Sequence, residues 1–204
     1  MYNSDEKKKY LKSNLSQKRY NHCLNVAEEC RKLAMKYGED PDKAYLAGLL
    51  HDICKEIPLE KQKELVLESG FSVCREELDT HSLWHAIAGA YFIKSEFSIE
   101  DIDIANAVRF HTVGRAGMTR LEEIVYLGDL ISADRDYKDV EKMRKLSYSS
   151  LNEAMCEAFS FSIKSVVKKG GVIPICTAEG YNFYIRICRE DKKKHNSDSR
   201  RVLK

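Results

Sequence analysis

The chain has 204 residues, of which 43% are hydrophobic and 32% are charged, a composition that is typical of a globular protein and excludes a disordered one. Its 34 Lys and Arg residues nearly balance 32 Asp and Glu residues, so the formal net charge is only +2 and any attraction for phosphate must be local. Three prolines and ten glycines are few helix breakers, which favours long helices over a many-turned β-sandwich or barrel.

No segment has the composition of a membrane span or a secretion signal. The first residues are polar or charged, and no apolar run approaches the ~18 residues that a span requires. The seven cysteines form no CxxC pair and indicate small buried side chains in a reducing compartment. We therefore expect a cytoplasmic protein.

The predicted elements are helices along the whole chain. Periodic apolar positions predict one helix over residues 16–37, capped by Ser16 and ended by Gly38, and a second over residues 40–53. Further helices are expected over residues 58–70, 82–94, 100–110, 119–133, 138–168 and 178–188, with a break near 147–150 left open. Because no alternating apolar and polar run of strand length occurs, the predicted fold is all-α.

The absence of an internal repeat or a Pro-, Gly- or Ser-rich linker favours a single domain. We expect this domain over residues 16–190. A helical segment over residues 1–15 precedes it, and a basic tail over residues 191–204, expected to be disordered, follows it.

Acidic residues interrupt two of the most apolar segments of the chain. Residues 46–50 are apolar all round, which predicts a helix buried on every side, and His51 and Asp52 follow directly. Asp129 interrupts the apolar segment IVYLGDLI in the same way. Since an unpaired buried carboxylate costs several kcal/mol, each acid requires a cationic partner, hydrogen-bond donors or a metal.

Three more histidines lie at the edges of apolar segments: His22, His85 and His111. A single histidine beside a core is more often a hydrogen-bonded structural residue than a ligand. The pair formed by His51 and Asp52 favours a metal, because one buried helix end then presents a neutral nitrogen and an anionic oxygen to the same cation.

The order His22, His51-Asp52 and Asp129 resembles the ligand order of the HD-domain metal-dependent phosphohydrolases, an all-helical superfamily. Flanking segments narrow the resemblance, over residues 16–190, to the YqeK-type bacterial HD hydrolases. These segments are RYNH (19–22), AGLLHDICKEIP (47–58), HAIAGA (85–90), RFHTVG (109–114) and MTRLEEIVYLGDLISADR (118–135). The resemblance implies an HD-domain helical bundle that cleaves diadenosine tetraphosphate symmetrically to two ADP with bound iron.

Carried over position by position, the resemblance assigns roles to individual residues. The implied metal ligands are His22, His51, Asp52 and Asp129. Positions that face the nucleotide phosphates are His85, His111, Thr112 and Arg135, and the ligands His22, Asp52 and Asp129 contact the substrate as well. Asp52, His85 and His111 are the implied catalytic residues.

This sequence departs from the family pattern near the last ligand. Gly128 precedes Asp129 where the family often has alanine, and Ser132, Ala133 and Asp134 precede Arg135 in place of a Glu-Pro pair. The segment HTVG also replaces HTTG, which keeps Thr112 but removes one hydroxyl.

Several residues keep two interpretations. His85 and His111 are either phosphate contacts or ligands of a second metal, and we favour the first because no bridging acid beyond Asp52 is evident. The segment GGVIPICT lines a base pocket through Ile173, Ile175 and Thr177, or is an ordinary hydrophobic turn. Lys18 and Arg19 meet phosphate or lie on a solvated helix face, which is the commoner case.

The donor set of two imidazoles and two carboxylates suits iron, manganese or cobalt, whereas a closed zinc site would prefer cysteines. A bound metal lowers the pKa of its water from ~15.7 to about 7, which supplies a nucleophile. Asp52 and Asp129 offset the charge of a divalent ion, so a polyphosphate needs further cations, and Arg135 is the best candidate because its fork suits two phosphate oxygens.

The sequence therefore predicts a symmetrical dinucleoside polyphosphate hydrolase. Within HD enzymes, the alternatives are a nucleotidase or a cyclic-nucleotide phosphodiesterase. Outside the enzymes, the alternative is an HD module that senses nucleotides without hydrolysing them. The expected partner is a small nucleotide, with no nucleic acid and no membrane, and a homodimer is left open.

Overall fold

The computed structural model describes residues 4–202, with side chains described over residues 4–193. All regular secondary structure in this described part is helical, so the all-α prediction is confirmed. The helices are α1 (Asp5–Asn14), α2 (Gln17–Tyr37), α3 (Pro41–Leu50), α4 (Leu59–Glu68), α5 (Arg75–Leu78), η1 (His81–Leu83), α6 (Trp84–Phe97), α7 (Ile102–Phe110), α8 (Arg120–Ile131), α9 (Val140–Ser147), α10 (Leu151–Lys168) and α11 (Ile175–Val202).

Side-chain caps start the first long helices where the sequence predicted them. The hydroxyl of Ser16 accepts a hydrogen bond from the backbone N–H of Arg19 at the start of α2. The carboxylate of Asp40 accepts from the backbone N–H groups of Asp42 and Lys43 at the start of α3. These bonds satisfy amide groups that have no partner inside the helix, which fixes both starts.

Some helix ends differ from the prediction. Helix α3 ends at Leu50, three residues before the expected end at residue 53, and the chain continues as turns. The break left open near 147–150 is present: residues 138–168 contain two helices, and the hydroxyl of Ser150 caps α10 by accepting from the N–H of Glu153. The last helix continues past Cys188 as far as Val202. The separation of a domain over residues 16–190 from its flanking segments stays a prediction.

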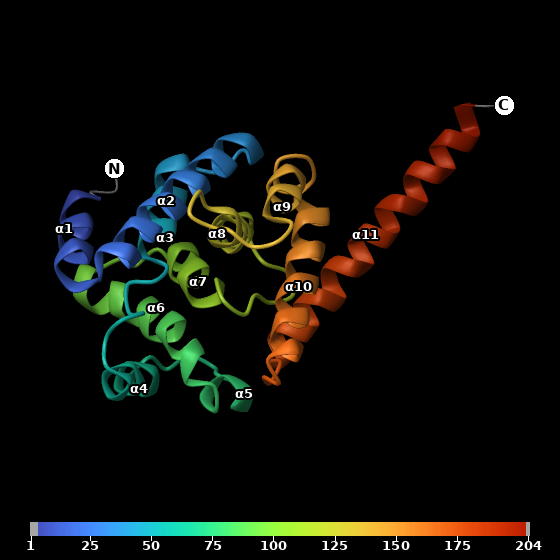
Figure 1. Ribbon diagram of the computed structural model, residues 1–204. Helices are drawn as coiled ribbons and strands as arrows, with labels where there is room; N and C mark the ends of the chain where they lie inside the picture. Colours follow the sequence, from blue (N-terminus) through green and yellow to red (C-terminus); the bar gives the residue numbers. More distant parts are fainter. Residues whose placement is uncertain (1–3, 203–204) are drawn as a thin grey trace.

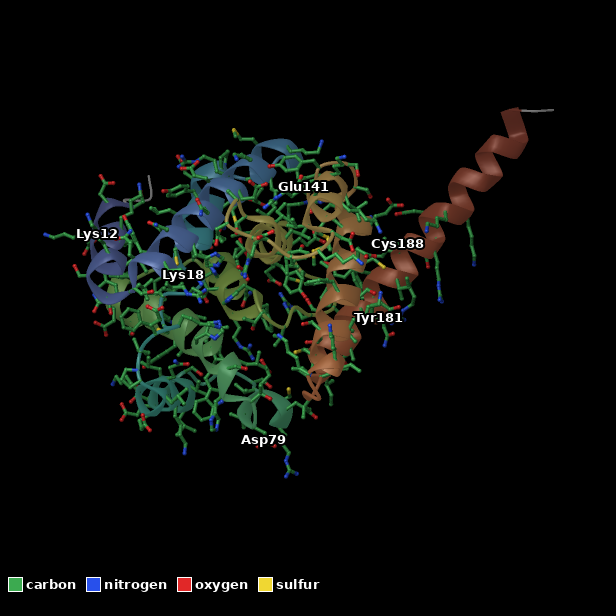
Figure 2. All side chains as sticks on the ribbon, viewed as in Figure 1. Lys12, Lys18, Asp79, Glu141, Tyr181 and Cys188 are labelled. Carbon is green, nitrogen blue, oxygen red and sulfur yellow. The ribbon has the colours of Figure 1, made fainter. Side chains whose placement is uncertain are left out.

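The helices surround one apolar core (Figure 1). Helix α2 packs against α3 and α8, and α7 packs against α3, α6 and α8. Residues 46–50 of α3 are buried, as predicted. Helix α10 pairs with α11, which then projects away from the bundle (Figures 1 and 2). None of the described helices combines the length and the apolar composition that a membrane span requires.

Two glycines bring α2, α3 and α8 close together around the thiol of Cys30. A Cβ atom at Gly48 in α3 would lie 2.8 Å from the Cys30 Sγ, and one at Gly128 in α8 would lie 2.5 Å from it. The Cys30 side chain therefore occupies the space that an alanine at position 128 would need, which accounts for this departure from the family pattern. The close approach holds the C-terminal end of α8, with Asp129, against α2.

Candidate metal centre

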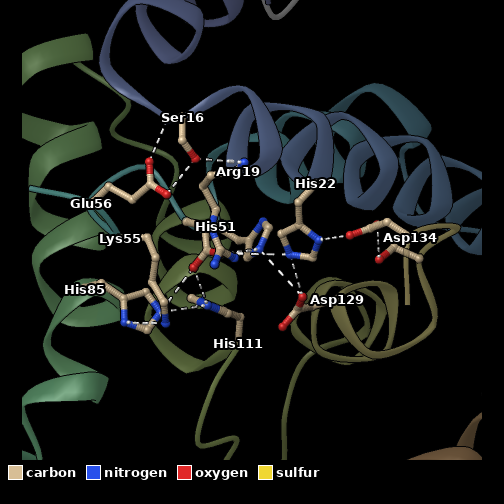
Figure 3. A network of polar contacts seen from close by, with 12 residues as sticks. Ser16, Arg19, His22, His51, Lys55, Glu56, His85, His111, Asp129 and Asp134 are labelled. Atoms are coloured by element: carbon tan, nitrogen blue, oxygen red, sulfur yellow. Dashed lines mark hydrogen bonds and ion pairs between the residues drawn. The ribbon is translucent and has the colours of Figure 1, made fainter. Parts of the chain in front are cut away.

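Six side chains from separate parts of the chain converge in the middle of the bundle (Figure 3). They come from the first half of α2, the end of α3 and the turn after it, the first turn of α6, the end of α7 and the last turns of α8. In chain order they are His22, His51, Asp52, His85, His111 and Asp129. Asp129 is partly buried and the other five are buried.

The four predicted metal ligands lie within a few ångströms of one another. The Nε2 of His22 lies 2.9 Å from Oδ1 of Asp129 and 3.9 Å from Oδ2 of Asp52. The Nε2 of His51 lies 3.4 Å from Oδ2 of Asp52 and 3.8 Å from Oδ1 of Asp129. Two sets of donor atoms lie within 4.8 Å of one another, as a bound cation requires: those of His22, His51 and Asp129, and those of His51, Asp52 and His111. His51 belongs to both sets, which together form a His/Asp cluster typical of a metal site.

Each of the four histidines is hydrogen-bonded through Nδ1. Because a carbonyl oxygen can only accept, Nδ1 carries the proton wherever it faces one, and Nε2 keeps a free lone pair. Such partners orient the histidine ligands of metal sites. The acceptors are the carbonyl oxygens of Gly48 for His51 (2.7 Å), Ser82 for His85 (2.9 Å) and Val108 for His111 (2.7 Å), and a carboxylate oxygen of Asp134 for His22 (2.8 Å).

Two of these lone pairs are buried without a partner. The Nε2 atoms of His22 and His51 make no hydrogen bond to any described residue, although the two side chains are only 5% and 0% exposed. Buried polar atoms are normally hydrogen-bonded, because an unsatisfied one is destabilising. A cation between these nitrogens and the carboxylates of Asp52 and Asp129 would remove this deficiency, so the residues fit a metal.

Asp52 lies at the centre of the cluster and is ionised. Burial opposes ionisation, but the nearby imidazoles of His51, His111 and His85 hold the pKa of the Asp52 carboxyl well below its usual value. Its Oδ2 accepts a hydrogen bond from Nη1 of Arg19 at 2.6 Å. Its Oδ1 lies 3.2 Å from Nε2 of His85 and 3.6 Å from that of His111. Asp52 thus links the predicted ligands to the two remaining histidines.

Asp129 is ionised for similar reasons. Burial works against its charge, whereas the nearby His22, His51 and Arg135 lower the pKa of Asp129. Arg135 donates from Nε to the backbone oxygen of Asp129 at 2.6 Å and from Nη2 to its carboxylate. The structure therefore places Arg135 beside a ligand; its contact with a phosphate stays a prediction.

His85 and His111 form the other half of the cluster. Their Nε2 atoms lie 3.3 Å apart, and the Nζ of Lys55 lies 3.2 Å from the Nε2 of His85. Burial lowers the pKa of His85 to about 4, which keeps its imidazole neutral. The next residue, Thr112, has a buried hydroxyl that bonds to no described residue.

Three polar residues beside the cluster were not among the predicted site residues. Arg19, one helical turn before His22, was considered only as a phosphate contact or part of a solvated helix face, and the structure pairs it with Asp52. Lys55 follows Asp52 in a turn, and Asp134 reaches His22 across 112 positions of sequence. No local pattern indicates these last two contacts, because they depend on the path of the chain.

The segment predicted to line a base pocket borders a hollow of about 250 Å³. Ile173 and Thr177 line this hollow together with Thr112 and Ser82, so it opens next to His111 and His85. Ile175 is not part of its lining and is 56% exposed, which corrects that part of the prediction. We call this space the neutral hollow, because all residues of its described lining except Lys169 are uncharged.

The chain matches known proteins over most of its length. Residues 19–134 match the HD domain family. The chain is 33% identical over 189 residues to the symmetrical bis(5'-nucleosyl)-tetraphosphatase of Bacillus subtilis strain 168. This match covers 90% of this chain and 98% of that protein. A protein of the same name from Halalkalibacterium halodurans is 35% identical over 174 residues, covering 84% of this chain and 91% of that protein.

A solved structure matches the fold equally well. The crystal structure of a Clostridium acetobutylicum protein, described as a predicted HD superfamily hydrolase involved in NAD metabolism, has a TM-score of 0.87 and 39% sequence identity. The match covers 91% of this chain and 98% of that chain. The resemblance inferred from the sequence is thus confirmed. The chain belongs to the HD domain family, in the YqeK-type group that contains the two bacterial tetraphosphatases.

Proposed function

We propose that this protein is a metal-dependent hydrolase that cuts dinucleoside tetraphosphates between their two central phosphates, so that diadenosine tetraphosphate gives two ADP. The observation that carries the proposal is the pair of orphaned, buried Nε2 atoms of His22 and His51 beside two ionised carboxylates. Relatives that match over 84–90% of the chain and bear the name of this activity support the substrate class.

We assign the metal to His22, His51, Asp52 and Asp129. Iron is the proposed ion, since the mixed nitrogen and oxygen set suits iron, manganese or cobalt and the family resemblance favours iron. When bound, such an ion supplies a water activated for attack on phosphorus. The hydrogen bonds that Nδ1 of His22 donates to Asp134 and Nδ1 of His51 donates to the carbonyl of Gly48 hold both imidazoles in the tautomer that ligation requires.

The surrounding cations prepare the centre for an anionic substrate. The ligands Asp52 and Asp129, together with Asp134, would by themselves repel a polyphosphate. Cationic side chains offset them from both sides: Arg19 contacts Asp52, Arg135 contacts Asp129, and Lys55 lies beside His85. When phosphate oxygens arrive, Arg135 can turn its fork from the carboxylate of Asp129 to two of them.

His85 and His111 handle protons and phosphate oxygens. Their Nδ1 protons are committed to backbone carbonyls, so each presents an Nε2 lone pair to the space beside Asp52. There they can accept a hydrogen bond or a proton from the attacking water and, once protonated, donate to a phosphate oxygen. The bond that breaks joins the two central phosphates, and ADP leaves as an anion that needs little help from an acid.

The neutral hollow holds one nucleoside of the substrate. Ile173 supplies apolar surface to its lining, and the unpaired hydroxyl of Thr112 can donate to a base, a ribose or an adjoining phosphate. Thr177 already donates its hydroxyl to the carbonyl of Val113 at 2.7 Å, so its role is to shape the wall.

A product assay tests the proposal. Protein loaded with iron or manganese is incubated with diadenosine tetraphosphate in ¹⁸O-labelled water. The products are separated by chromatography, and their masses are measured by mass spectrometry. We expect ADP alone, with one ¹⁸O atom for each pair of ADP molecules, and elemental analysis should find the metal bound to the protein. ATP and AMP as products would contradict a symmetrical cut.

Further outcomes distinguish the alternative functions. Release of phosphate from mononucleotides, without cleavage of diadenosine tetraphosphate, would indicate a nucleotidase. Hydrolysis of cyclic nucleotides alone would indicate a phosphodiesterase. Tight binding of nucleotide by the metal-loaded protein without turnover would indicate a sensor.

A further inference from the structure

A second hollow opens from the metal centre on the side of His22. Its volume is about 360 Å³, and its lining comes from the start of α2 and the loop after α8. The lining residues are Lys18, Arg19, His22, Asp134, Arg135, Asp136 and Tyr137. None of them lines the neutral hollow, so the centre lies between two separate spaces. We call the second one the cationic hollow.

The cationic hollow contains hydrogen-bond donors that have no partner among the described residues and could bind an anionic group of the substrate. Lys18 lies at the start of α2 (Figure 2) and makes no ion pair or hydrogen bond within the described residues. Arg19 uses Nη1 for Asp52, but its Nε is buried and bonds to no described atom. Buried donors of this kind are ordinarily satisfied, by the protein or by something bound to it.

The carboxylates of the cationic hollow do not cancel its cations. Asp134 is already engaged, because it accepts hydrogen bonds from Ser132 and Asn25 and contacts Nδ1 of His22. Asp136 carries the other negative charge. Arg19 and Arg135 contact Asp52 and Asp129, whose two negative charges a divalent metal would offset. With a metal bound, Lys18, Arg19 and Arg135 would therefore carry three positive charges against the two negative charges of Asp134 and Asp136, which favours an anion beside the metal centre.

Tyr137 joins the cationic hollow to a third space of about 260 Å³. Met143, Leu146 and Phe161 form the apolar part of the lining of this aromatic hollow, and two lysines and two acids complete it. The rings of Tyr137 and Phe161 lie 4.6 Å apart between centroids. The hydroxyl of Tyr137 is buried and bonds to no described residue. An aromatic surface next to an unpaired hydroxyl suits a heterocyclic base, which has a π face and hydrogen-bonding edges.

A path from the metal centre through the cationic hollow to the aromatic hollow passes first a metal ligand, then the cations and finally an aromatic ring. A nucleotide extending from the cleaved bond presents its groups in the same order: phosphate at the metal, a further phosphate, then the nucleoside. We propose that the cationic and aromatic hollows bind the second nucleotide half of the substrate, with its phosphates against Lys18 and Arg19 and its base against Tyr137. This inference rests on the proposed function, since it assumes a substrate with two nucleotide halves.

The two halves of a chemically symmetrical substrate then occupy unequal sites. One nucleoside lies in the neutral hollow, and the other half follows the cations to Tyr137. A compound that lacks the second nucleoside but keeps all four phosphates should therefore lose the contact with Tyr137 and keep those with Lys18 and Arg19. Adenosine 5'-tetraphosphate is such a compound.

Steady-state kinetics of the metal-loaded protein test this arrangement. KM for diadenosine tetraphosphate is compared with KM, or the inhibition constant, of adenosine 5'-tetraphosphate. Tyr137→Ala should raise the first value at least tenfold and change the second less than twofold. Lys18→Ala should raise both severalfold and weaken their dependence on salt. Lys12→Ala, an exposed lysine of α1 (Figure 2), is the matched control and should change neither.

Variants that keep a large apolar side chain at position 137 allow the test even if Tyr137→Ala does not fold. Should Tyr137→Ala not fold by circular dichroism, Tyr137→Leu removes the ring while filling the space, and the same selective rise in KM is expected. Tyr137→Phe isolates the hydroxyl and should raise KM less than loss of the ring.

The outcomes separate the two proposals. If the wild-type protein does not cut diadenosine tetraphosphate, the proposed function fails. If it cuts this substrate but loss of the Tyr137 ring affects both compounds equally, or neither, the second-half site is overturned while the proposed function stands.

Discussion

The two ends of α8 carry acids that are buried or, for Asp129, partly buried, but the acids are satisfied in different ways. In the first turn, Glu122 is 0% and Glu123 is 8% exposed. Arg115 donates to the two oxygens of Glu122 at 2.8 and 2.6 Å, and the hydroxyl of Tyr184 donates to Glu123 at 2.7 Å. In the last turns, Asp129 faces histidine nitrogens that bond to no described group.

The comparison shows that a buried acid does not by itself indicate a functional site. At the N-terminal end of α8, a bidentate arginine and a phenol complete the hydrogen bonding within the protein. At the C-terminal end, the negative charge is compensated in part by Arg135, but the lone pairs of His22 and His51 are left over. A cation can bind nitrogen lone pairs that have no hydrogen-bond donor. The unpaired lone pairs of His22 and His51 therefore distinguish the metal centre from the other end of α8.

The largest expected effect is that of Asp129→Asn. Loss of one anionic ligand should reduce metal affinity and hydrolysis of diadenosine tetraphosphate at least ~100-fold, because even partners of ligands contribute up to about that factor. In the wild type, a metal at 100 times its Kd adds about 2.7 kcal/mol to the free energy of unfolding. Asp129→Asn should lose this gain, which urea unfolding with and without metal measures.

The matched variant at the other end of α8 is Glu122→Gln. It should keep the metal-dependent gain in stability and the turnover per folded molecule. A gain that persists in Asp129→Asn, or disappears in Glu122→Gln, would contradict the distinction between the two ends.

A smaller effect, on stability alone, is expected from Glu122→Ala. Removing one partner of a buried ion pair destabilises by ~3–5 kcal/mol. Because the Arg115 side chain is 32% exposed and can reach water, we expect a loss smaller than this range, about 2–3 kcal/mol after allowance for solvent screening. Urea unfolding of the metal-free protein measures the loss.

A double variant controls for the orphaned arginine. Glu122→Leu combined with Arg115→Met replaces the pair by apolar groups of similar volume and should recover most of the lost stability. If the double variant is no more stable than Glu122→Ala, the carboxylate stabilises this end of α8 by something other than its pairing with Arg115.

The sequence indicated Asp52 and Asp129 because each interrupts an apolar segment, and the structure places both in one cluster. It gave no comparable signal for Glu122 and Glu123, although they are as buried. Acids in the first turn of a helix are common, since they favour the positive end of the helix dipole. The partner of Glu123, Tyr184, lies 61 residues away in the sequence, and no local pattern could reveal this contact.

The same limit applies to the fold. The longer helices were predictable from apolar periodicity, and the starts of α2 and α3 from their capping residues, whereas the short α5 and η1 were not predicted. The end of α3 was not, because the turn at residues 51–56 is fixed by contacts with other helices, such as those of Asp52 with Arg19 and of Glu56 with Ser16. His51 and Asp52 of the metal centre lie directly after Leu50, where these long-range contacts end the helix that the local sequence would continue.

The smallest expected effect is a pH dependence that comes from Glu123. Burial raises the pKa of the Glu123 carboxyl above its usual value, against the hydrogen bond from Tyr184. The native state thus holds this proton more tightly than the unfolded chain does. Its contribution to stability is complete below the ordinary pKa of glutamate and is lost as pH rises through the raised value, at about 1.4 kcal/mol per unit of difference.

Measurement of the free energy of unfolding from pH 4 to pH 7 checks this sign. Relative to Glu123→Gln, which stays neutral, the wild type should lose stability as pH rises, whereas Glu100→Gln, at an exposed acid, should show no such trend against the wild type. A wild type that gains stability relative to Glu123→Gln would mean that Arg120, 3.6 Å from the carboxylate, outweighs burial. Both ends of α8 would then hold ionised acids, and only the orphaned imidazoles of His22 and His51 would distinguish them.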